Sequence, residues 1–320
     1  MNMAILGAGN IASMMAKTVR EMEEVNLYAV AARDRERAVK FAEEFGVQHP
    51  YGSYEEMLKD NGVDLVYVAT PHSHHYEHAR LCISYGRPVL CEKAFTENAE
   101  EAEELLAFAK EKGVFITEAM WVRYMPMSVM LKEIIASGRI GRVVGLTANL
   151  GYSLMHVERM VRPELAGGAL LDLGVYTLNF ATWVLGDEVQ NMTVAMVKHD
   201  TGVDKQELID LIYADGTVAG LFNTMQATTD RKGYIYGTEG HIVVDNINNY
   251  EAFHIYNNQY ELEETIDCPK QITGYEYEVL ACKKALEEGK LECAEMPHEH
   301  TLRIMRILDQ IRAMWTEEKS

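Results

Sequence analysis

The chain has 320 residues, of which 49 are Asp or Glu and 30 are Lys or Arg, so its formal net charge at pH 7 is -19. This surplus of acid disfavours binding to nucleic acid and to anionic membrane surfaces. We find no apolar stretch of the ~18 residues that a membrane-spanning helix needs, and a strand at residues 3–6 leaves no room for a signal peptide. The composition therefore predicts a cytoplasmic protein.

The five cysteines are odd in number and scattered, at positions 82, 91, 268, 282 and 293. Such spacing indicates neither a disulfide framework nor a zinc site. Histidines at residues 72–78 invite a metal hypothesis, because His74 and His78 are four residues apart, but no third ligand lies at a suitable spacing. We expect reduced thiols and no bound metal.

The first elements in the chain predict a dinucleotide-binding unit. An apolar strand, residues 3–6, precedes a G-x-G-x-x-A fingerprint at residues 7–12, a helix at 13–23 and a second strand at 27–32. The glycines of this motif let the turn and backbone approach a pyrophosphate, which the helix N-terminus attracts. The residues that we expect to contact the cofactor here are Gly7, Gly9, Asn10 and Ile11.

The end of the second strand bears on the choice of cofactor. An acidic side chain there normally binds the ribose 2′-hydroxyl and would repel a 2′-phosphate. Here Ala32 is followed by Arg33 and Asp34. Because an arginine can pair with phosphate and stack on adenine, Arg33 favours NADP, while Asp34 leaves NAD as the alternative. Arg33 could also be no more than the solvated start of the helix at 35–45.

Strands and helices continue to alternate as far as residue 117. Strands at 64–69, at 88–93 and at 114–117 are separated by helices at 76–85 and 98–112. This alternation predicts a parallel, doubly wound sheet of the Rossmann type. Ligands bind such sheets at the carboxyl ends of the strands, where the chain has Thr70, Pro71, Glu92, Lys93 and Glu118.

The pattern changes near residue 119. A helix at 125–137, a strand at 143–150 and a helix at about 170–185 lead into repeated β-type runs between 189 and 266, with no crossover helices between them. Two further helices, at about 275–288 and 299–317, end the chain. We therefore predict a dinucleotide-binding domain at residues 1–119 and a substrate-binding α+β domain at 120–320, with a large, mainly antiparallel open sheet. If helices cover only one face of this sheet, the apolar side chains on its other face must pack against something else. We therefore expect a homodimer that forms through this second face.

Together these motifs resemble the glucose-fructose oxidoreductase, inositol dehydrogenase and rhizopine-catabolism protein superfamily, abbreviated Gfo/Idh/MocA. The resemblance covers essentially the whole chain, and the matching stretches are residues 7–12, Ala69-Thr70-Pro71 with His75, Glu92-Lys93, residues 118–126 and residues 167–176. Tyr176, where inositol dehydrogenases carry histidine, makes the chain most similar to the branch of dimeric dihydrodiol dehydrogenases and NADP-dependent aldose dehydrogenases.

This resemblance implies that Lys93, Asp172 and Tyr176 are catalytic and that His75 lies beside the cofactor. We expect the other nearby histidines to be solvated. Hydride transfer from a carbinol carbon needs a group that takes the hydroxyl proton, and a phenol with a pKa of about 10 is a poor base near neutral pH. A neighbouring ammonium lowers that pKa. Asp172 would hold Lys93 charged and orient the substrate. Whether Lys93 or Tyr176 exchanges the proton stays open.

One residue departs from the family pattern, because Ala94 follows the Glu-Lys pair where relatives usually have proline. A cis peptide bond before a residue other than proline is intrinsically unfavourable by roughly 3 kcal/mol. We therefore expect a trans bond between Lys93 and Ala94, and with it a changed direction for the lysine side chain.

Three further side chains are candidates for the substrate site. Arg123 could hydrogen-bond several hydroxyls, and the indole of Trp121 could stack on a sugar or aromatic ring. Arg159 is similar to a family arginine that lines the substrate cleft. Each also has an ordinary structural alternative, a core position for Trp121 and a surface ion pair for either arginine.

The sequence thus predicts an NADP-dependent oxidoreductase that interconverts a hydroxyl and a carbonyl on a small polyol, sugar or cyclic diol. The alternative is a cofactor-bound sensor or regulator that keeps this fold without the chemistry. Retention of Lys93, Asp172 and Tyr176 argues against that alternative.

Overall fold

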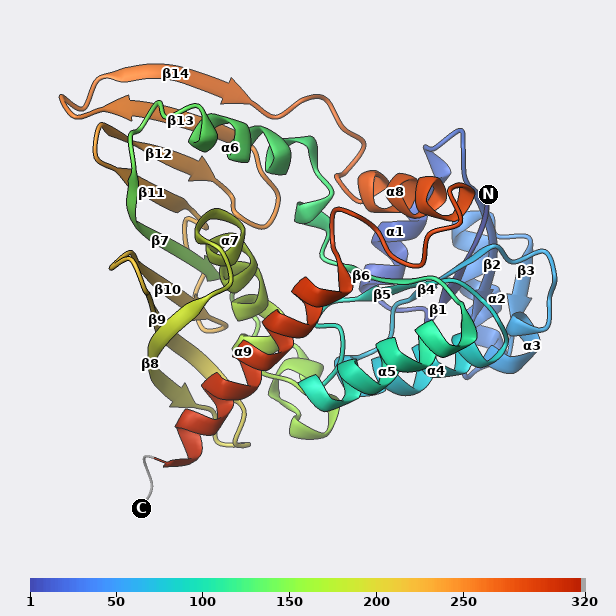
Figure 1. The fold of residues 1–320 in the computed structure, drawn as a ribbon. Helices are drawn as coiled ribbons and strands as arrows, with labels where there is room; N and C mark the ends of the chain where they lie inside the picture. Colours follow the sequence, from blue (N-terminus) through green and yellow to red (C-terminus); the bar gives the residue numbers. More distant parts are fainter. Residues whose placement is uncertain (318–320) are drawn as a thin grey trace. The chain divides into compact units, whose positions relative to one another are not determined.

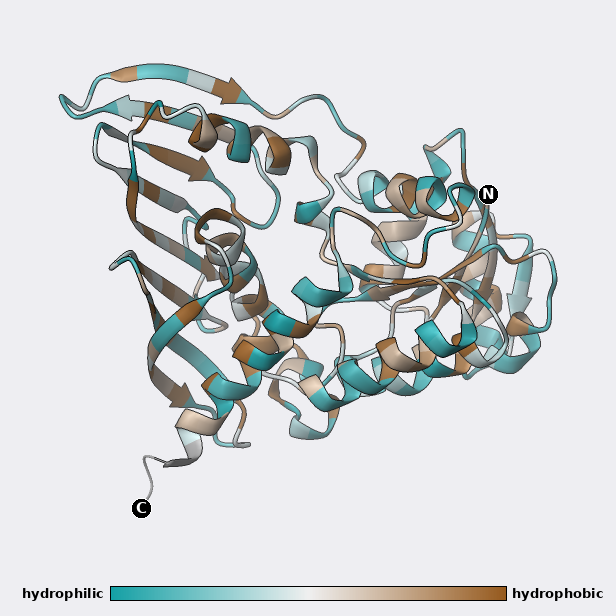
Figure 2. Ribbon diagram, viewed as in Figure 1, coloured by the Kyte–Doolittle hydropathy of each residue, from teal (hydrophilic) through white to brown (hydrophobic). Residues whose placement is uncertain are grey.

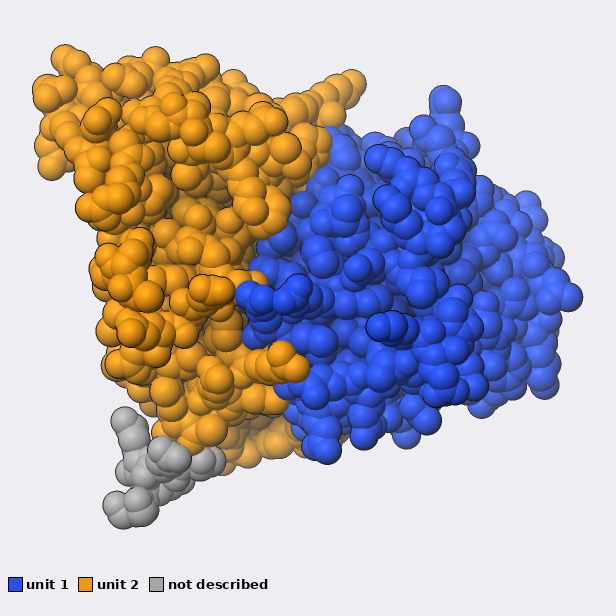
Figure 3. All heavy atoms as spheres, in the orientation of Figure 1, with its two compact units in different colours: residues 1–124, 271–305 blue, residues 125–270, 306–320 orange. Residues whose placement is uncertain are grey.

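The structure of the protein is a computed structural model that describes residues 1–317. The chain folds into two compact units, which Figure 3 colours separately. The first contains residues 1–124 and 271–305, and the second contains residues 125–270 and the chain from residue 306 onward. The N-terminal unit is therefore not one continuous segment, because residues 271–305 follow the sheet of the second unit in sequence.

A six-stranded parallel sheet in the order β3-β2-β1-β4-β5-β6 forms the centre of the first unit (Figure 1). Its strands are β1 (Asn2–Leu6), β2 (Asn26–Ala31), β3 (His49–Tyr51), β4 (Leu65–Val68), β5 (Val89–Glu92) and β6 (Ile116–Ala119). Its helices are α1 (Asn10–Arg20), α2 (Arg35–Phe45), α3 (Tyr54–Leu58), α4 (His75–Ser84), α5 (Ala99–Lys112) and α8 (Glu276–Glu287). The predicted doubly wound parallel sheet is confirmed.

The strands of this sheet are apolar because helices cover both of its faces. Helices α1 and α8 lie on one face and α4 and α5 on the other (Figure 1). Helix α5 shows alternating teal and brown bands in Figure 2, as an amphipathic helix does, and its buried side includes Leu105 and Leu106. The sequence did not predict β3 and α3, which are three and five residues long, too short for a periodic pattern.

An eight-stranded sheet in the order β14-β13-β12-β11-β7-β10-β9-β8 forms the second unit. Its strands are β7 (Val143–Gly151), β8 (Val189–Lys198), β9 (Asp204–Tyr213), β10 (Val218–Thr224), β11 (Gly233–Gly237), β12 (Gly240–Asp245), β13 (Ala252–Asn257) and β14 (Leu262–Asp267). Only β7 and β10 pair in parallel, so the mainly antiparallel sheet is confirmed. Helices α6 (Pro126–Ala136) and α7 (Val175–Leu185) lie on one face, as Figure 1 shows. The last helix, α9 (His298–Glu317), begins in the first unit and ends in the second.

The helical stretch Pro163–Leu185 contains an 18-residue window with a mean hydropathy of 1.2, long and apolar enough to cross a membrane. We did not expect such a window. However, 83% of it is buried inside the structure, which is typical of the core helix of a globular protein.

Candidate functional site

The fingerprint turn connects β1 to α1. Gly7 has a φ of +110°, and a Cβ on it would lie 2.8 Å from the carbonyl oxygen of Ala69, so only glycine fits. Gly9 is the N-cap of α1, and a Cβ there would meet nothing within 4 Å. The amides at Asn10 and Ile11 belong to the first turn of α1, whose N–H groups point out of the helix end. The fold therefore requires glycine at position 7, whereas the space around Gly9 fits the approach of a ligand.

Two arginines lie near this turn. Arg33 is exposed just after β2, and Asp34 beside it accepts a hydrogen bond of 2.9 Å from the amide of Glu36, so its carboxylate caps α2. Arg37 Nη2 donates to the carbonyl oxygen of Ala8, at 3.3 Å. We did not predict a role for Arg37 from the sequence, although its position four residues after Arg33 could have indicated it.

His75 joins the segments that follow β4 and β5. Its side chain is fully buried, with Nε2 2.8 Å from the carbonyl oxygen of Thr70 and Nδ1 2.8 Å from that of Ala94. Burial lowers the pKa of His75 to about 4, against the effect of these two carbonyl oxygens, so the ring is neutral at pH 7. A neutral imidazole has a single N–H and donates to one carbonyl at a time.

We expected the neighbouring histidines to be solvated, but His72 and His78 are buried or partly buried. His72 is 6% exposed, and His78 is partly buried with Nδ1 3.0 Å from Thr70 Oγ1. Burial also lowers the pKa of His78 to about 4. The prediction failed because these residues follow a buried strand and pack against it, which their polarity alone does not indicate. Thr70 and Pro71 themselves are half-buried.

The neutral state of His75 predicts a pH-dependent stability. The unfolded chain binds a proton at about pH 6.5 and the folded chain only at about pH 4, so this contribution is complete above pH 6.5 and is lost as the pH falls toward 4. Between pH 7 and pH 5, the free energy of unfolding of the native protein should fall by roughly 2 kcal/mol more than that of His75→Gln, measured by urea titration. The exposed His156→Gln is the control. Equal losses in His75→Gln and the native protein would contradict the assignment.

Glu92 anchors the end of β5. It is 6% exposed, and the hydroxyl of Tyr67 on β4 donates to its Oε1 while the amide of Lys93 donates to Oε2 at 3.1 Å. Burial, together with the charge of Glu92, raises the pKa of Tyr67 well above its usual value, so the phenol remains a donor. The backbone that carries Lys93 is thus held by the carboxylate of Glu92.

The bond between Lys93 and Ala94 is cis, so our expectation of a trans bond was wrong. That expectation rested on the preference of an isolated peptide. Here Ala94 is completely buried and its carbonyl oxygen is bound by the His75 ring, so the local preference competes with tertiary contacts.

Trp121 and Arg123 are both buried in the first unit. The indole of Trp121, 6% exposed, stacks on Tyr275 with the ring centroids 4.2 Å apart. Arg123 is 4% exposed, and its Nη1 lies 2.9 Å from His300 Nε2. These contacts join the segment after β6 to residues 271–305, and a role for either side chain in substrate binding stays a prediction.

Glu118 is a buried acid at one of the strand ends where we expected ligands to bind. It lies in β6, is 1% exposed, and its Oε2 accepts a hydrogen bond of 2.9 Å from Thr301 Oγ1. Burial raises its pKa to about 7, against the effect of the Thr301 hydrogen bond. Acids with a raised pKa are common near active sites, but ion-pair networks also produce them.

The predicted site residues of the second unit lie around one helical segment. A π-helical turn, η5 (Leu170–Gly174), carries Asp172 and continues into α7, whose second residue is Tyr176. Both side chains are buried, at 6% and 7% exposure. Arg159 Nη2 donates to Asp172 Oδ1 at 3.0 Å. The structure therefore joins Arg159 to Asp172, and the meeting of this group with Lys93 stays a prediction.

Comparison with known proteins agrees with these features. The family model described as an oxidoreductase family with an NAD-binding Rossmann fold matches residues 1–120, and the Gfo/Idh/MocA C-terminal domain model matches residues 129–243. Among solved structures, an aldose-aldose oxidoreductase from Caulobacter crescentus has a TM-score of 0.90 at 20% identity, over 100% of this chain and 98% of that one. A 3-ketoreductase from Actinomadura kijaniata, solved with NADP and TDP-benzene, has a TM-score of 0.88 at 24% identity, over 98% and 97%. These two likenesses show the fold.

Curated relatives are more similar in sequence. The D-xylose 1-dehydrogenase (NADP(+)) of Hypocrea jecorina is 34% identical, over 96% of this chain and 90% of its own. The trans-1,2-dihydrobenzene-1,2-diol dehydrogenase of Homo sapiens is 32% identical, over 96% and 95%. The resemblance inferred from the motifs is thereby confirmed, and the chain belongs to the Gfo/Idh/MocA oxidoreductase family.

Proposed function

We propose that the protein is an NADP-dependent dehydrogenase that transfers hydride between the nicotinamide and a hydroxyl-bearing carbon of a sugar or cyclic diol. The observation that carries the proposal is the buried pair Asp172 and Tyr176 on one helical segment, with Arg159 bound to the carboxylate. Burial of a carboxylate and a phenol has a free-energy cost, and groups of this kind can bind and deprotonate an alcohol. The two curated relatives described above act, by their names, on a sugar and on a diol.

The first unit fits the proposed cofactor. The turn at Gly9 leaves space in front of the α1 N-terminus, which attracts a pyrophosphate. Arg33 and Arg37 supply two guanidinium groups beside the fingerprint, where a 2′-phosphate would pair with them. Asp34 is already engaged in capping α2, which weakens the case for NAD. The neighbouring strand ends carry the other predicted cofactor residues. Thr70 and Pro71 follow β4, where His75 binds the carbonyl oxygen of Thr70, and Glu92 ends β5 and binds the amide of Lys93.

The bound nicotinamide would accept a hydride from the carbinol carbon as the alcohol becomes a carbonyl, and the hydroxyl proton must then leave to a protein group. Lys93 and Tyr176 are the two candidates for that proton, because an ammonium can stabilise a phenolate or exchange the proton itself. Asp172, which accepts a hydrogen bond from Arg159, would orient the substrate hydroxyl. Trp121 and Arg123 remain candidates for shaping the substrate site.

The test is reduction of NADP+, followed at the nicotinamide absorbance band, with a panel of aldoses, inositols and cyclic trans-diols, in parallel with NAD+. We expect turnover on at least one class and a higher kcat/KM with NADP+. A protein that binds NADPH tightly but turns over no member of the panel would favour the sensor alternative.

We further propose a cytoplasmic homodimer formed through the open face of the large sheet. Along β9 and β10 the side chains alternate, so that Ile209 and Leu221 are fully buried while Leu208 and Val218 are 45% and 50% exposed. Leu208 and Val218 point away from α6 and α7, and an exposed apolar face of this kind is typical of an interface.

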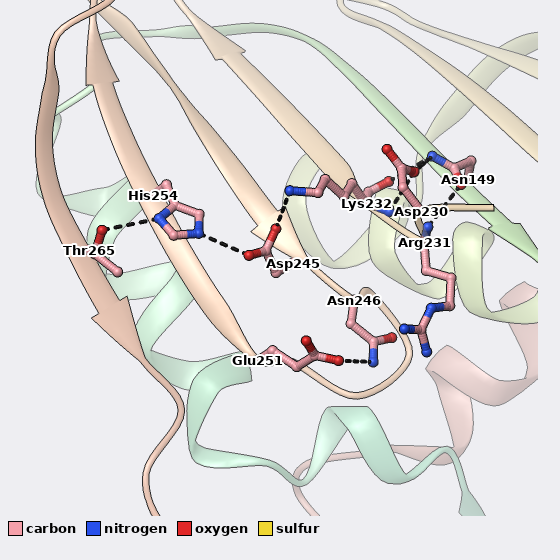
Figure 4. A network of polar contacts seen from close by, with 9 residues as sticks. All are labelled: Asn149, Asp230, Arg231, Lys232, Asp245, Asn246, Glu251, His254 and Thr265. Atoms are coloured by element: carbon pink, nitrogen blue, oxygen red, sulfur yellow. Dashed lines mark hydrogen bonds and ion pairs between the residues drawn. The ribbon is translucent and has the colours of Figure 1, made fainter.

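The same face becomes polar toward β14. Figure 4 shows Lys232 and His254 both bound to Asp245, with His254 also reaching Thr265. Burial alone would raise the pKa of Asp245, but the hydrogen bonds from Lys232 and His254 lower it. The apolar part of the face, over β8 to β10, is therefore the part that we expect to pack against a second copy.

The dimer predicts a solution mass of twice 36.2 kDa, measured by sedimentation equilibrium. Val218→Glu places a charge on the apolar part of this face and should shift the mass toward that of one chain, because an unpaired buried charge strongly disfavours association. Glu263→Lys, on the exposed outer strand β14, is the control. A native protein with the mass of one chain would refute the dimer.

A further inference from the structure

The helical segment that carries Asp172 and Tyr176 begins in an unusual way. Its first turn, η5, is π-helical, a geometry that occurs mostly as single turns and often at functional sites. The first amides of any helix need acceptors from outside the helix. Here the acceptor comes from Asp204, the first residue of β9, whose Oδ2 accepts a hydrogen bond of 2.5 Å from the amide of Leu170.

The Gly167-Gly168 pair makes this contact sterically possible. Gly168 has a φ of +120°, and a Cβ on it would lie 2.3 Å from Asp204 Oδ1. A Cβ on Gly167 would lie 2.4 Å from the carbonyl oxygen of Arg159. The missing side chain of Gly168 thus leaves space for the carboxylate of Asp204. That of Gly167 leaves space for the backbone of Arg159, whose side chain binds Asp172.

A second buried group supports the other end of the turn. Glu207, 1% exposed on β9, lies beside Gly174, since a Cβ on that glycine would be 3.1 Å from Glu207 Oε1. Thr177 Oγ1 donates to Asn223 Oδ1 at 3.0 Å. Burial, and then the charge of Asp204, raises the pKa of Glu207 well above its usual value. The turn is therefore held between two neighbouring strands, β9 and β10.

We propose that Asp204 is a positioning residue for the catalytic segment. Its carboxylate binds the amide of Leu170, the first residue of η5, and fixes the turn against the start of β9, which sets where Asp172 and Tyr176 point. Asp204 is itself 8% exposed and lies in β9 of the eight-stranded sheet, so it offers a rigid attachment for the turn. This inference rests on the proposed function, because it takes Asp172 and Tyr176 as the working groups.

The experiment compares Asp204→Ala and Asp204→Asn with the native protein, using Asp200→Ala and Asp200→Asn as matched controls on the exposed turn before β9. Amide hydrogen exchange of residues 167–176, measured without substrate, should be about tenfold faster in Asp204→Ala, because a charge-assisted hydrogen bond is lost. With the best substrate of the panel, kcat should fall about 100-fold while the Kd for NADPH stays the same, because small displacements of reacting groups have effects of this size. The Asp204→Asn side chain keeps one acceptor oxygen, so the kcat of this variant should be about tenfold higher than that of Asp204→Ala.

The two readouts separate the possible failures. Unchanged exchange at residues 167–176, or a kcat near that of the native protein while Tyr176→Phe is inactive, would overturn the positioning role. Should Asp204→Ala not fold, Asp204→Asn decides by the same two criteria. A native protein without turnover would defeat the proposed function instead, and the exchange of residues 167–176 would then decide whether Asp204 holds the turn.

Discussion

Lys93→Met should lower kcat by about 10³-fold, because the substitution keeps the length of the side chain and removes its ammonium, which either exchanges the substrate proton or stabilises the group that does. Lys93 follows Glu92, whose carboxylate binds the Lys93 amide, so the backbone at this position should be unchanged. We therefore expect the Kd for NADPH to stay within about threefold of the native value, since general acid–base groups act on the chemical step.

Turnover with NADP+ and direct titration of NADPH binding measure the two quantities. The matched control is Lys59→Met, which removes an exposed ammonium at the end of α3 in the same unit. If Lys93→Met kept most of the native turnover while binding NADPH normally, the assignment of Lys93 would be wrong. Loss of NADPH binding would instead assign the lysine to the cofactor.

Tyr176→Phe is the second substitution with a large expected effect, a fall in kcat of about 10²- to 10³-fold. It removes one hydroxyl from a side chain that is 7% exposed, so packing in α7 is retained. The control is Tyr260→Phe, which removes the hydroxyl of a tyrosine that is 84% exposed in the same unit. Full activity of Tyr176→Phe would exclude the phenol from the chemistry.

The pH dependence of the two variants distinguishes the proton-exchanging group. If Tyr176 is the base, the residual activity of Lys93→Met should rise with pH toward about 10, where an unassisted phenol ionises. If Lys93 is the base, this rise should be absent, and Tyr176→Phe should keep the pH profile of the native protein. The comparison answers a question that the sequence left open.

Much of the fold could be predicted because its signals are local. The fingerprint at residues 7–12 has a strand before it and a helix after it, and the turn-forming pair Asp215-Gly216 falls between β9 and β10. Exposure alternates with polarity in the middle of β9, where Ile209 and Leu211 are buried and Asp210 between them is exposed. Short elements such as β3 carry no such period, and they form because a neighbouring strand is already in place.

The residues of the candidate site could be predicted from the sequence, but the contacts that they make could not. The pattern named His75, Glu92 and Asp172, yet it did not indicate that His75 would join Thr70 to Ala94 or that Tyr67 would bind Glu92. Those partners are 19 and 25 residues away in sequence. Such contacts depend on which strands become neighbours, and a single sequence has no local feature that records them.

Local patterns in the sequence are enough to predict the class of fold, the position of the cofactor fingerprint and the residue types that the family chemistry needs, because strand periodicity, helix periodicity and glycine motifs act over a few residues. The cis bond before Ala94, the return of residues 271–305 to the first unit and the attachment of η5 to Asp204 appear only in the folded chain. In each of these cases burial and hydrogen bonds from distant residues outweigh, or add to, the preference of the local backbone.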